Sequence, residues 1–514
     1  MACSRYSIDE YKVDVKKYGL ELTWRKILEA KLKDDPYYSE IGIKDFGNLY
    51  EAGLAEADKE KKKESGKYYT PSDVSGVMAR WLRPLSGENV VDVGCGTGNL
   101  VLSYLELIGK DDARKLIKKG NLYLYDLDAT ALDICKHSIA LLYGKDLLES
   151  IKVVEGDFLS SNLSLPNDCK VISNPPYAKI ASKSDSWAES AVIDDSKELY
   201  AAFFEKILKQ SKSSVIISPY SFCGASKFYS LRKVLNQHSG FIVSFDNVPG
   251  NIFRGKKHGI FNSNHANSVR ASITVTNNET NRSGYRLSPL LRFNSSERER
   301  LLDNETLERF IGANYQVVTD GDKEYKKCQS QLEQVLEKWE NAKTEKIADL
   351  IQSKPNQFAL HVPTTCRYYC VASKRCLSRT GKHVLFAKNQ DCFDYLYAFI
   401  NSSFLYWRWR MLDGGINLTW KLLLSTPTFF KSIGDKEKRA IHELVEKAIE
   451  SESDHLAYKM NAGALQENIK FPKHIRDEFN REMLEYIGAK EKPPIFNPLH
   501  SNRLFESNGG QNES

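Results

Sequence analysis

The sequence predicts an α/β fold in which a parallel sheet carries helices on both faces, followed by a smaller mixed α/β domain. Two observations support this prediction. Short apolar runs that are typical of buried strands alternate with helical segments between residues 65 and 295, which is the pattern of a parallel sheet. The chain of 514 residues is also longer than one hydrophobic core usually accommodates, so at least two domains are expected.

The composition is that of an ordinary globular protein. Charged residues make up 27% and hydrophobic residues 41%, and the net charge of +6 is too small to demand a nucleic-acid partner by itself. The 10 cysteines are scattered singly without a Cys-x-x-Cys pair, so we predict reduced thiols and no metal site. No apolar run approaches the ~18 residues of a membrane span. We therefore expect a cytoplasmic protein with no membrane partner.

A motif that ends one of the expected strands consists of Asn174, Pro175, Pro176 and Tyr177, directly after the apolar run 171–172. A strand that meets two prolines stops abruptly, because neither has an N–H for the sheet and each restricts the residue before it. The Asn side chain and the nearby carbonyls then face a cleft beside an aromatic ring. Such a site suits a planar amine, which needs acceptors for its protons and a ring to stack on. A plain Pro-Pro turn is the alternative.

A glycine-rich turn follows the expected strand at residues 90–93. It contains Asp92, Gly94, Cys95, Gly96 and Gly98. Glycine permits positive φ and lets the backbone approach a ligand closely. The spacing differs from the Gly-x-Gly-x-x-Gly of dinucleotide folds, and no Lys-Ser/Thr pair follows, so neither a dinucleotide site nor a P-loop is predicted. The acid suits a ligand that carries a cationic amine.

Two further expected strands end in acidic residues. One ends at Asp126, Leu127 and Asp128, where a carboxylate can bind the hydroxyls of a ribose; the choice between the two acids stays open. Another leads to Asp157 and Phe158, where a carboxylate can accept from an adenine amino group and a ring can cover the base. Because the carboxyl ends of parallel strands meet at one edge of a sheet, these groups predict a single ligand site.

Tyr69, Thr70 and Pro71 lead into a helix that is expected at residues 72–82. Pro fits the first turn of a helix, and the N–H groups of a helix start together with a hydroxyl can seat a carboxylate. An ordinary helix cap is the alternative interpretation of this segment.

These segments, in their order along the chain, resemble the S-adenosylmethionine-dependent adenine-N6 DNA methyltransferases of the gamma group. The resemblance is carried by residues 68–71, 92–98, Asp126, 157–158 and 174–177. It implies a Rossmann-like methyltransferase sheet and S-adenosylmethionine as cofactor. Residues 69–71 would hold the methionine end of the cofactor, Asp126 and the adjoining Leu127 its ribose, and residues 157–158 its adenine.

The resemblance also implies a reaction, which is methyl transfer to N6 of an adenine flipped out of double-stranded DNA. The Asn174 oxygen and the Pro175 carbonyl would accept the two N–H protons of the amine, and Tyr177 would stack on the base. Positioning would then be the main contribution to catalysis, with no general base. We expect the modification component of a restriction-modification or related defence system, with a separate cognate restriction endonuclease as a further partner.

Basic and aromatic residues are concentrated at 354–431, where 11 Lys or Arg stand against 3 Asp or Glu. This composition suits the phosphate backbone of DNA, so we expect target recognition there. The residues predicted to contact DNA are Phe253, Lys256, Lys257, Arg367, Lys374, Arg375 and Arg379. The resemblance makes Phe253 or Phe261 a candidate for stacking on the extruded base, with a flexible basic surface loop as the alternative. Tyr395, Phe399 and Trp407 are more typical of a core.

Five segments are expected along the chain. They are a helical extension at 1–64, the catalytic domain at 65–295, a helical connector at 296–353, a DNA-recognition domain with a helical appendage at 354–490, and a disordered tail at 491–514.

Three rival functions share parts of this pattern. A protein glutamine methyltransferase also holds an amide with Asn-Pro-Pro-Tyr, but such enzymes lack the Tyr-Tyr-Thr-Pro segment and a large basic C-terminal module. A DNA-binding module with a vestigial methyltransferase fold is disfavoured because the cofactor positions all carry competent residues. A cytosine-N4 enzyme would be favoured by Ser in place of Asn174.

Overall fold

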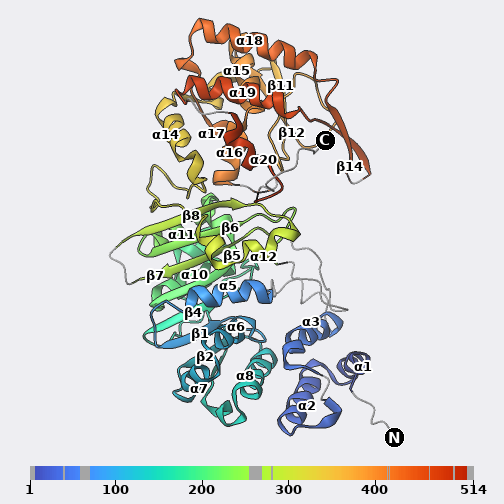
Figure 1. Ribbon diagram of the computed structural model, residues 1–514, viewed down its shortest axis with the longest axis vertical. Helices are drawn as coiled ribbons and strands as arrows, with labels where there is room; N and C mark the ends of the chain where they lie inside the picture. The colour runs from blue at the N-terminus through green and yellow to red at the C-terminus, as the bar shows by residue number, and fades with distance from the viewer. Residues whose placement is uncertain are drawn as a thin grey trace. The chain divides into compact units, whose positions relative to one another are not determined.

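The computed structural model describes residues 6–38, 41–57, 70–253, 269–278, 282–413, 415, 417–461, 463–489 and 493–505. The chain divides into two compact units, residues 1–325 and 326–514 (Figure 1). The division falls within residues 296–353, the predicted helical connector. The longest helix of that segment is α14 (Glu333–Ala342), in the second unit.

Within the described residues, the first unit contains one eight-stranded sheet in the order β3-β2-β1-β4-β5-β7-β6-β8. All neighbouring pairs are parallel except those of β7, which runs antiparallel to both β5 and β6. The α/β prediction with a Rossmann-like sheet is therefore confirmed. The strands are β1 Asn89–Val93, β2 Leu122–Asp126, β3 Lys152–Glu155, β4 Cys169–Ser173, β5 Ser213–Pro219, β6 Ser239–Phe245, β7 Ala271–Asn277 and β8 Gly284–Leu291.

The register of the central strands brings their carboxyl ends to one level. Val93 of β1 pairs with Ser173 of β4 on one side and with Tyr125 of β2 on the other. Tyr125 pairs in turn with Val154 of β3. The segments that follow these four strands therefore leave the sheet at the same edge, where polar groups meet as expected for a doubly wound sheet.

Helices cover both faces of the sheet (Figure 1). On one face, α10 and α11 share a hydrophobic core with alternate strand residues such as Val91, Val171 and Ile216. On the other face, α5 packs on β4, β5 and β7, and α6 on β1 and β4. The helices of this unit are α1 Ile8–Tyr18, α2 Leu20–Leu32, α3 Phe46–Ala57, α5 Ser72–Leu82, α6 Asn99–Ile108, α7 Lys110–Lys118, α8 Ala129–Tyr143, α9 Ala191–Ser196, α10 Leu199–Gln210, α11 Tyr229–Leu235, α12 Arg298–Leu301 and α13 Asn304–Glu308.

The N-terminal helices form a small cluster that packs on α8. Trp24 and Ile27 of α2 are buried in this cluster together with Ala131 and Ile134 of α8. The hydroxyl of Tyr50 adds a 2.6 Å hydrogen bond to Asp128 Oδ2. The helical extension is thus attached to the helix that follows β2.

The sheet ends with β8, which adds a parallel partner to β6 at the edge. Pro289 within β8 obscures the strand pattern, and proline is compatible with an edge strand because one side of that strand needs no N–H.

No helix among the described residues is long and apolar enough to cross a membrane.

The second unit has its own core, built around α15, α16, α18 and α19 next to a three-stranded antiparallel sheet in the order β10-β12-β11. Tyr395, Phe399 and Trp407 are buried in this core, as expected. The elements of this unit are α14 Glu333–Ala342, β9 Glu345–Lys346, β10 Ile351–Gln352, β11 Ala359–Pro363, β12 Lys382–Ala387, α15 Gln390–Asn401, α16 Ser403–Leu412, α17 Trp420–Ser425, β13 Pro427–Thr428, α18 Asp435–Glu450, β14 Leu456–Asn461, β15 Ala464–Ile469, α19 Lys473–Tyr486 and α20 Asn497–His500.

Candidate active site

The amide of Asn174 is fixed at the carboxyl end of β4. Its Nδ2 donates a 2.9 Å hydrogen bond to Thr70 Oγ1, and Thr70 is a buried residue two positions before α5. The preceding Ser173 donates from its hydroxyl to the Val93 carbonyl at 2.7 Å, which ties the end of β4 to the end of β1. Because one N–H of the amide is committed to Thr70, the orientation of the acceptor oxygen Oδ1 is set.

Asp92 carries a buried carboxyl group at the end of β1. Its Oδ2 accepts from the Val101 N–H at 3.1 Å, whereas Oδ1 is buried and meets no hydrogen-bond donor in the described part of the chain. Burial raises the pKa of Asp92 to about 8, and the nearby Asp126 adds to the rise. A buried carboxyl group with one unpaired oxygen is suited to a hydrogen-bond donor or a cation that a ligand supplies.

The glycine turn presents its backbone to open space. Gly94 has φ +70° and Gly96 φ +52°, and no atom of the described residues lies within 4 Å of the position where a Cβ would stand on Gly96. By contrast, a Cβ on Gly98 would lie 2.5 Å from Cys135 Sγ, so that glycine is required by packing. Cys95 is buried, and its N–H donates to the Tyr125 carbonyl at 3.0 Å.

Asp126 and Asp128 have different positions. Asp126 lies at the end of β2, and its Oδ2 accepts from the Gly96 N–H at 2.8 Å. Asp128 caps α8, with its Oδ1 accepting from the Ala131 N–H at 3.1 Å and its Oδ2 from Tyr50. Asp126 is therefore the acid at the glycine turn, and Leu127 between them is 70% exposed.

Asp157 and Phe158 follow β3 and are both held by other residues. Trp187 donates from its indole N–H to Asp157 Oδ2 at 2.6 Å, and the Leu159 N–H donates to Oδ1 at 3.0 Å. The ring of Phe158 is only 4% exposed and packs 5.1 Å from the ring of Phe203. Trp187 was not identified from the sequence, since an indole 30 positions away follows no local pattern.

An aromatic group lies next to the Asn-Pro-Pro-Tyr motif. The ring centroid of Tyr177 is 6.0 Å from that of Phe253 and 6.2 Å from that of Tyr200. The Tyr177 hydroxyl donates to the Ile217 carbonyl of β5 at 3.3 Å. Tyr177 and Phe253 are half-buried, while Tyr200 is buried. The structure thus brings Phe253, which was expected to stack on a base, next to Tyr177.

Four of the predicted residues, Tyr69, Lys256, Lys257 and Phe261, lie outside the described residues. The described residues on the cofactor side, Thr70, Pro71 and Asn99, lie together: the Asn99 amide nitrogen at the start of α6 donates to the Thr70 carbonyl at 3.4 Å.

The basic residues predicted to bind DNA differ in their surroundings within the second unit. Arg367, Lys374 and Arg375 are exposed, although Arg375 also pairs with Glu467 at 3.7 Å. Arg379 is half-buried, and its guanidinium donates to the Gly381 carbonyl at 3.0 Å, to Thr365 Oγ1 at 2.6 Å and to Asn468 Oδ1. Arg379 therefore joins the loop before β12 to the β14–β15 hairpin.

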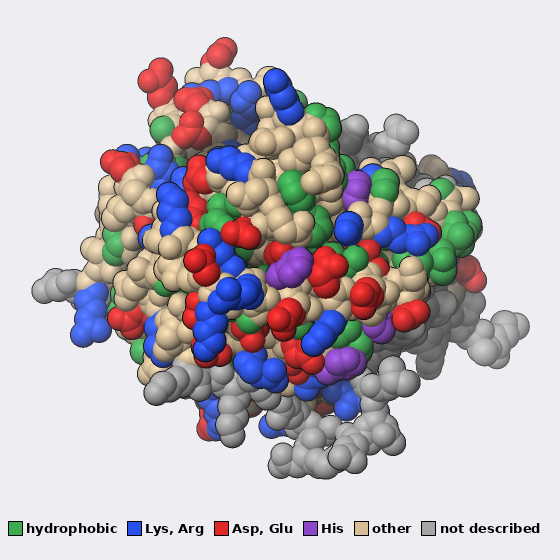
Figure 2. All heavy atoms as spheres, turned by 90° about the horizontal axis from the view of Figure 1, so that it is seen from above, with side chains coloured by type: hydrophobic (Ala, Val, Ile, Leu, Met, Phe, Trp, Pro, Cys, Tyr) green, Lys and Arg blue, Asp and Glu red, His purple; other side chains and the backbone are tan. Residues whose placement is uncertain are grey.

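One face of the molecule, seen in Figure 2 from the α18 side, shows acidic and basic side chains interspersed. The helix α18 itself has both signs along its length, for example Lys436, Glu437, Lys438 and Glu443. A DNA-binding face requires a local surplus of positive charge. The face drawn in Figure 2 therefore does not have the uniform positive charge of such a surface.

The comparisons with known proteins address the same region. Residues 42–280 match the family model N-6 DNA Methylase. This match contains Thr70, Asp92 and Asn174, and it agrees with the resemblance at the level of that family. The match spans less than half of the chain. It contains β1 to β7 and leaves β8 and the second unit outside.

Curated relatives match over similar lengths. Type II methyltransferase M.PstI of Providencia stuartii is 28% identical over 202 residues, which is 36% of this chain and 39% of that protein. Type II methyltransferase M.BanIII of Aneurinibacillus aneurinilyticus is 26% identical over 230 residues, or 38% of this chain and 37% of that protein. The matched part thus spans less than two fifths of the length of these relatives. Among solved structures, a DrdV–DNA complex is 12% identical with a TM-score of 0.46, covering 84% of this chain and 63% of that chain.

Proposed function

We propose that this chain transfers a methyl group from S-adenosylmethionine to N6 of an adenine that is flipped out of DNA. The observation that carries the proposal is the amide of Asn174, which Thr70 holds at the end of β4 next to the ring of Tyr177. The N-6 DNA Methylase match and the names of the curated relatives, which are methyltransferases, support it. The order of the motifs supports an assignment to the gamma group.

The surroundings of the glycine turn fit the proposed cofactor. Among the described residues, Oδ1 of buried Asp92 meets no donor and the position of a Cβ on Gly96 is open, which suits a ligand with a cationic amine. We assign the methionine end of the cofactor to residues 69–71, its ribose to Asp126 and its adenine to residues 157–158. The bound cofactor supplies an electrophilic methyl group on a sulfonium.

The residues of the chain then act on the target base by positioning it. The exocyclic amine of adenine is a poor nucleophile because its lone pair is delocalised into the ring. Asn174 Oδ1 and the Pro175 carbonyl accept hydrogen bonds from its two N–H groups, which localises the lone pair on the nitrogen. Tyr177 and Phe253 offer rings on which the unstacked base rests, and this offsets part of the few kcal/mol that flipping costs.

The second unit is the proposed site of DNA recognition. Its exposed basic residues Arg367, Lys374 and Arg375 supply the positive charge that phosphate contacts require. In the cell we assign the chain to the modification side of a restriction-modification or related defence system, with a separate cognate endonuclease.

The test is to express the protein in cells without adenine methylation and to digest their DNA to nucleosides. Mass spectrometry should show 6-methyladenine, and long-read sequencing should give the modified motif. Asn174→Ala should abolish the signal while cofactor binding persists. The matched control is Asn162→Ala, which removes an exposed amide from the segment before β4 and should leave the signal unchanged.

Two results would overturn the proposal. One is the absence of 6-methyladenine above background when the protein is folded and binds S-adenosylmethionine. The other is normal methylation by Asn174→Ala. Labelled methyl groups that appear in protein instead of DNA would favour the glutamine methyltransferase.

A further inference from the structure

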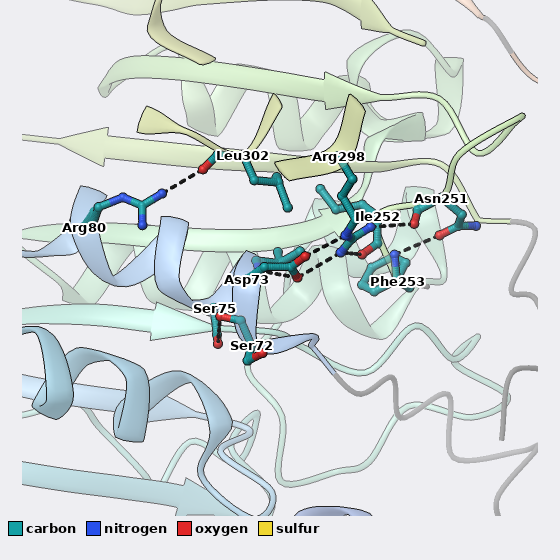
Figure 3. Close-up of polar contacts among 10 residues, drawn as sticks. Ser72, Asp73, Ser75, Arg80, Asn251, Ile252, Phe253, Arg298 and Leu302 are labelled. Atoms are coloured by element: carbon teal, nitrogen blue, oxygen red, sulfur yellow. Dashed lines mark hydrogen bonds and ion pairs between the residues drawn. The ribbon is translucent and has the colours of Figure 1, made fainter. Parts of the chain in front are cut away.

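Arg298, the first residue of α12, makes a two-point ion pair with Asp73 in the first turn of α5. Its Nε lies 2.6 Å from Asp73 Oδ2, and its Nη2 lies 2.9 Å from Asp73 Oδ1 (Figure 3). Arg298 is only 6% exposed and the Asp73 side chain 29%, so the guanidinium is buried and the carboxylate is partly open to solvent. Paired N–H···O contacts of this kind fix direction as well as distance.

The same guanidinium also holds a third segment of the chain. Its Nη1 donates to the Asn251 carbonyl at 2.9 Å, and its Nη2 donates to the Ile252 carbonyl at 2.8 Å. The next residue is Phe253, whose N–H donates to Asn251 Oδ1 at 2.8 Å. Arg298 therefore binds α5 with one edge of its guanidinium and the Phe253 segment with the rest, as Figure 3 shows.

The two segments that Arg298 joins form the two sides of the proposed adenine pocket. Asp73 lies three residues after Thr70, whose hydroxyl accepts a hydrogen bond from the Asn174 amide. Phe253 has its ring 6.0 Å from that of Tyr177. A displacement of the Phe253 segment relative to α5 would therefore change the distance between the aromatic surface and the amide that receives the base.

Lysine cannot reproduce these contacts. Its ammonium is a single point with three donors, whereas the guanidinium presents donors in a planar fork that reaches a carboxylate and two carbonyls at once. Glutamine would leave Asp73 without its cation and at least one carbonyl without a donor, and unmet buried groups favour rearrangement of the segment.

We propose that Arg298 is a positioning residue for base capture, which sets the Phe253 ring at the correct place relative to Asn174 and Tyr177. This inference rests on the proposed function. It assigns Arg298 no contact with cofactor or DNA; its effect passes through the carbonyls of Asn251 and Ile252 to Phe253.

The chain offers a matched control in Arg80. It lies on the same helix α5 and donates from Nη2 to the Leu302 carbonyl at 2.8 Å (Figure 3), directly after α12. Arg80 thus joins the same two parts of the fold as Arg298, and none of its hydrogen bonds reaches residues 251–253. Arg80→Gln tests general loss of packing between α5 and α12 without loss of the Phe253 anchor.

The experiment compares Arg298→Gln, Arg298→Lys, Asp73→Asn and Arg80→Gln with the wild type. Turnover is measured on an unmodified duplex that carries the motif found by sequencing. Base flipping is measured on a second duplex with 2-aminopurine at the target position, which has no 6-amino group to methylate and fluoresces when it is unstacked. We expect Arg298→Gln to lower kcat by about 10- to 100-fold, the effect of a misplacement of roughly 1 Å, and to reduce the 2-aminopurine signal. The affinity for S-adenosylmethionine and the KM for it should change little.

The order of effects separates positioning from folding. Arg298→Gln should lose the most activity and Arg298→Lys somewhat less. Asp73→Asn retains the carbonyl contacts of Arg298 and should lose less than either. Arg80→Gln should stay near the wild type. Hydrogen exchange gives a readout that is independent of activity: the peptide containing residues 251–253 should exchange faster in Arg298→Gln than in Arg80→Gln. Thermal unfolding ensures that all rates refer to folded protein.

The outcomes distinguish the two proposals. A wild type that methylates no adenine would refute the proposed function, while the exchange measurement would still decide whether Arg298 anchors the Phe253 segment. An active wild type with equal kcat and equal exchange in Arg298→Gln and Arg80→Gln would overturn the role of Arg298.

Discussion

The hydroxyl of Thr70 and the amide of Asn174, 104 positions apart in the chain, meet in a 2.9 Å hydrogen bond. The motifs predict Thr70 on the cofactor side of the site and Asn174 on the side of the target base. Thr70 also accepts from Asn99 at the start of α6 through its carbonyl, so it bonds to both segments. The geometry of the amide therefore depends on the segment that is expected to contact the cofactor.

Thr70→Val tests this dependence. The substitution preserves shape and removes the acceptor of the Asn174 Nδ2 proton, so the amide loses its fixed orientation. We expect kcat to fall by about 10- to 100-fold, with a loss of about 1 kcal/mol in the free energy of unfolding for the missing hydrogen bond. Steady-state methylation assays and denaturant unfolding measure the two effects.

Thr70→Ser provides the control, since it restores the hydroxyl without the methyl group. Its turnover should stay close to that of the wild type. Equal losses in Thr70→Ser and Thr70→Val would mean that the methyl group matters and that the hydrogen bond to Asn174 does not.

Asp92→Asn should remove a pH dependence of stability. Burial raises the pKa of Asp92 in the folded protein to about 8, so the folded state keeps a proton that the unfolded chain releases above about pH 4. The wild type therefore loses stability from this group as the pH rises through this window to about pH 8. The amide does not ionise. The difference in melting temperature between Asp92→Asn and the wild type should therefore shift in favour of Asp92→Asn as the pH is raised from acidic values to pH 8.

Asp92→Asn should also weaken the binding of the proposed cofactor, although it removes the loss of stability at higher pH. A cationic amine next to Asp92 requires the ionised carboxylate, so binding of S-adenosylmethionine to the wild type should tighten as the pH rises towards 8. In Asp92→Asn the affinity should be lower and less dependent on pH. Isothermal titration calorimetry at several pH values measures this, and an unchanged affinity would exclude a contact between Asp92 and the amine.

Removal of the rings at Tyr177 and Phe253 should weaken base capture. Stacking of a base on an aromatic ring contributes about 1–3 kcal/mol, so Tyr177→Ala and Phe253→Ala should each lower kcat/KM for DNA by about 10- to 100-fold. Tyr177→Phe keeps the ring and loses only the bond to the Ile217 carbonyl, and it should lose far less. If Tyr177→Phe is as impaired as Tyr177→Ala, the hydroxyl carries the effect.

Much of the sheet and of the site edge followed from local sequence. The helix expected at residues 72–82 is α5 with the same bounds, because its apolar spacing and the preceding proline are local signals. The strands before Asp126 and Asn174 also appear where expected. Parallel strands share an edge, so local signals at the strand ends were sufficient to assemble the candidate site.

Contacts between distant segments could not be predicted. The Arg298–Asp73 pair spans 225 positions, and the bond from Trp187 to Asp157 spans 30; neither follows a helical or strand period. The burial of Phe158 was not predicted either. Its exposed fraction is 4% because its ring packs against Phe203 of α10. Such features depend on tertiary packing, for which one sequence contains no periodic signal.

Lys374 and Arg379 were both predicted to contact DNA, but their surroundings lead to different expectations. Lys374 is exposed, so Lys374→Ala should leave the melting temperature unchanged and reduce the slope of log K for DNA against log salt by about 0.9 if one phosphate contact is lost. Arg379 bonds to Gly381, Thr365 and Asn468, so Arg379→Ala should destabilise the protein by about 2 kcal/mol. Salt titrations of DNA binding and thermal unfolding separate these cases. A stable Arg379→Ala variant with a reduced salt slope would show that its guanidinium leaves the β14–β15 hairpin to bind phosphate.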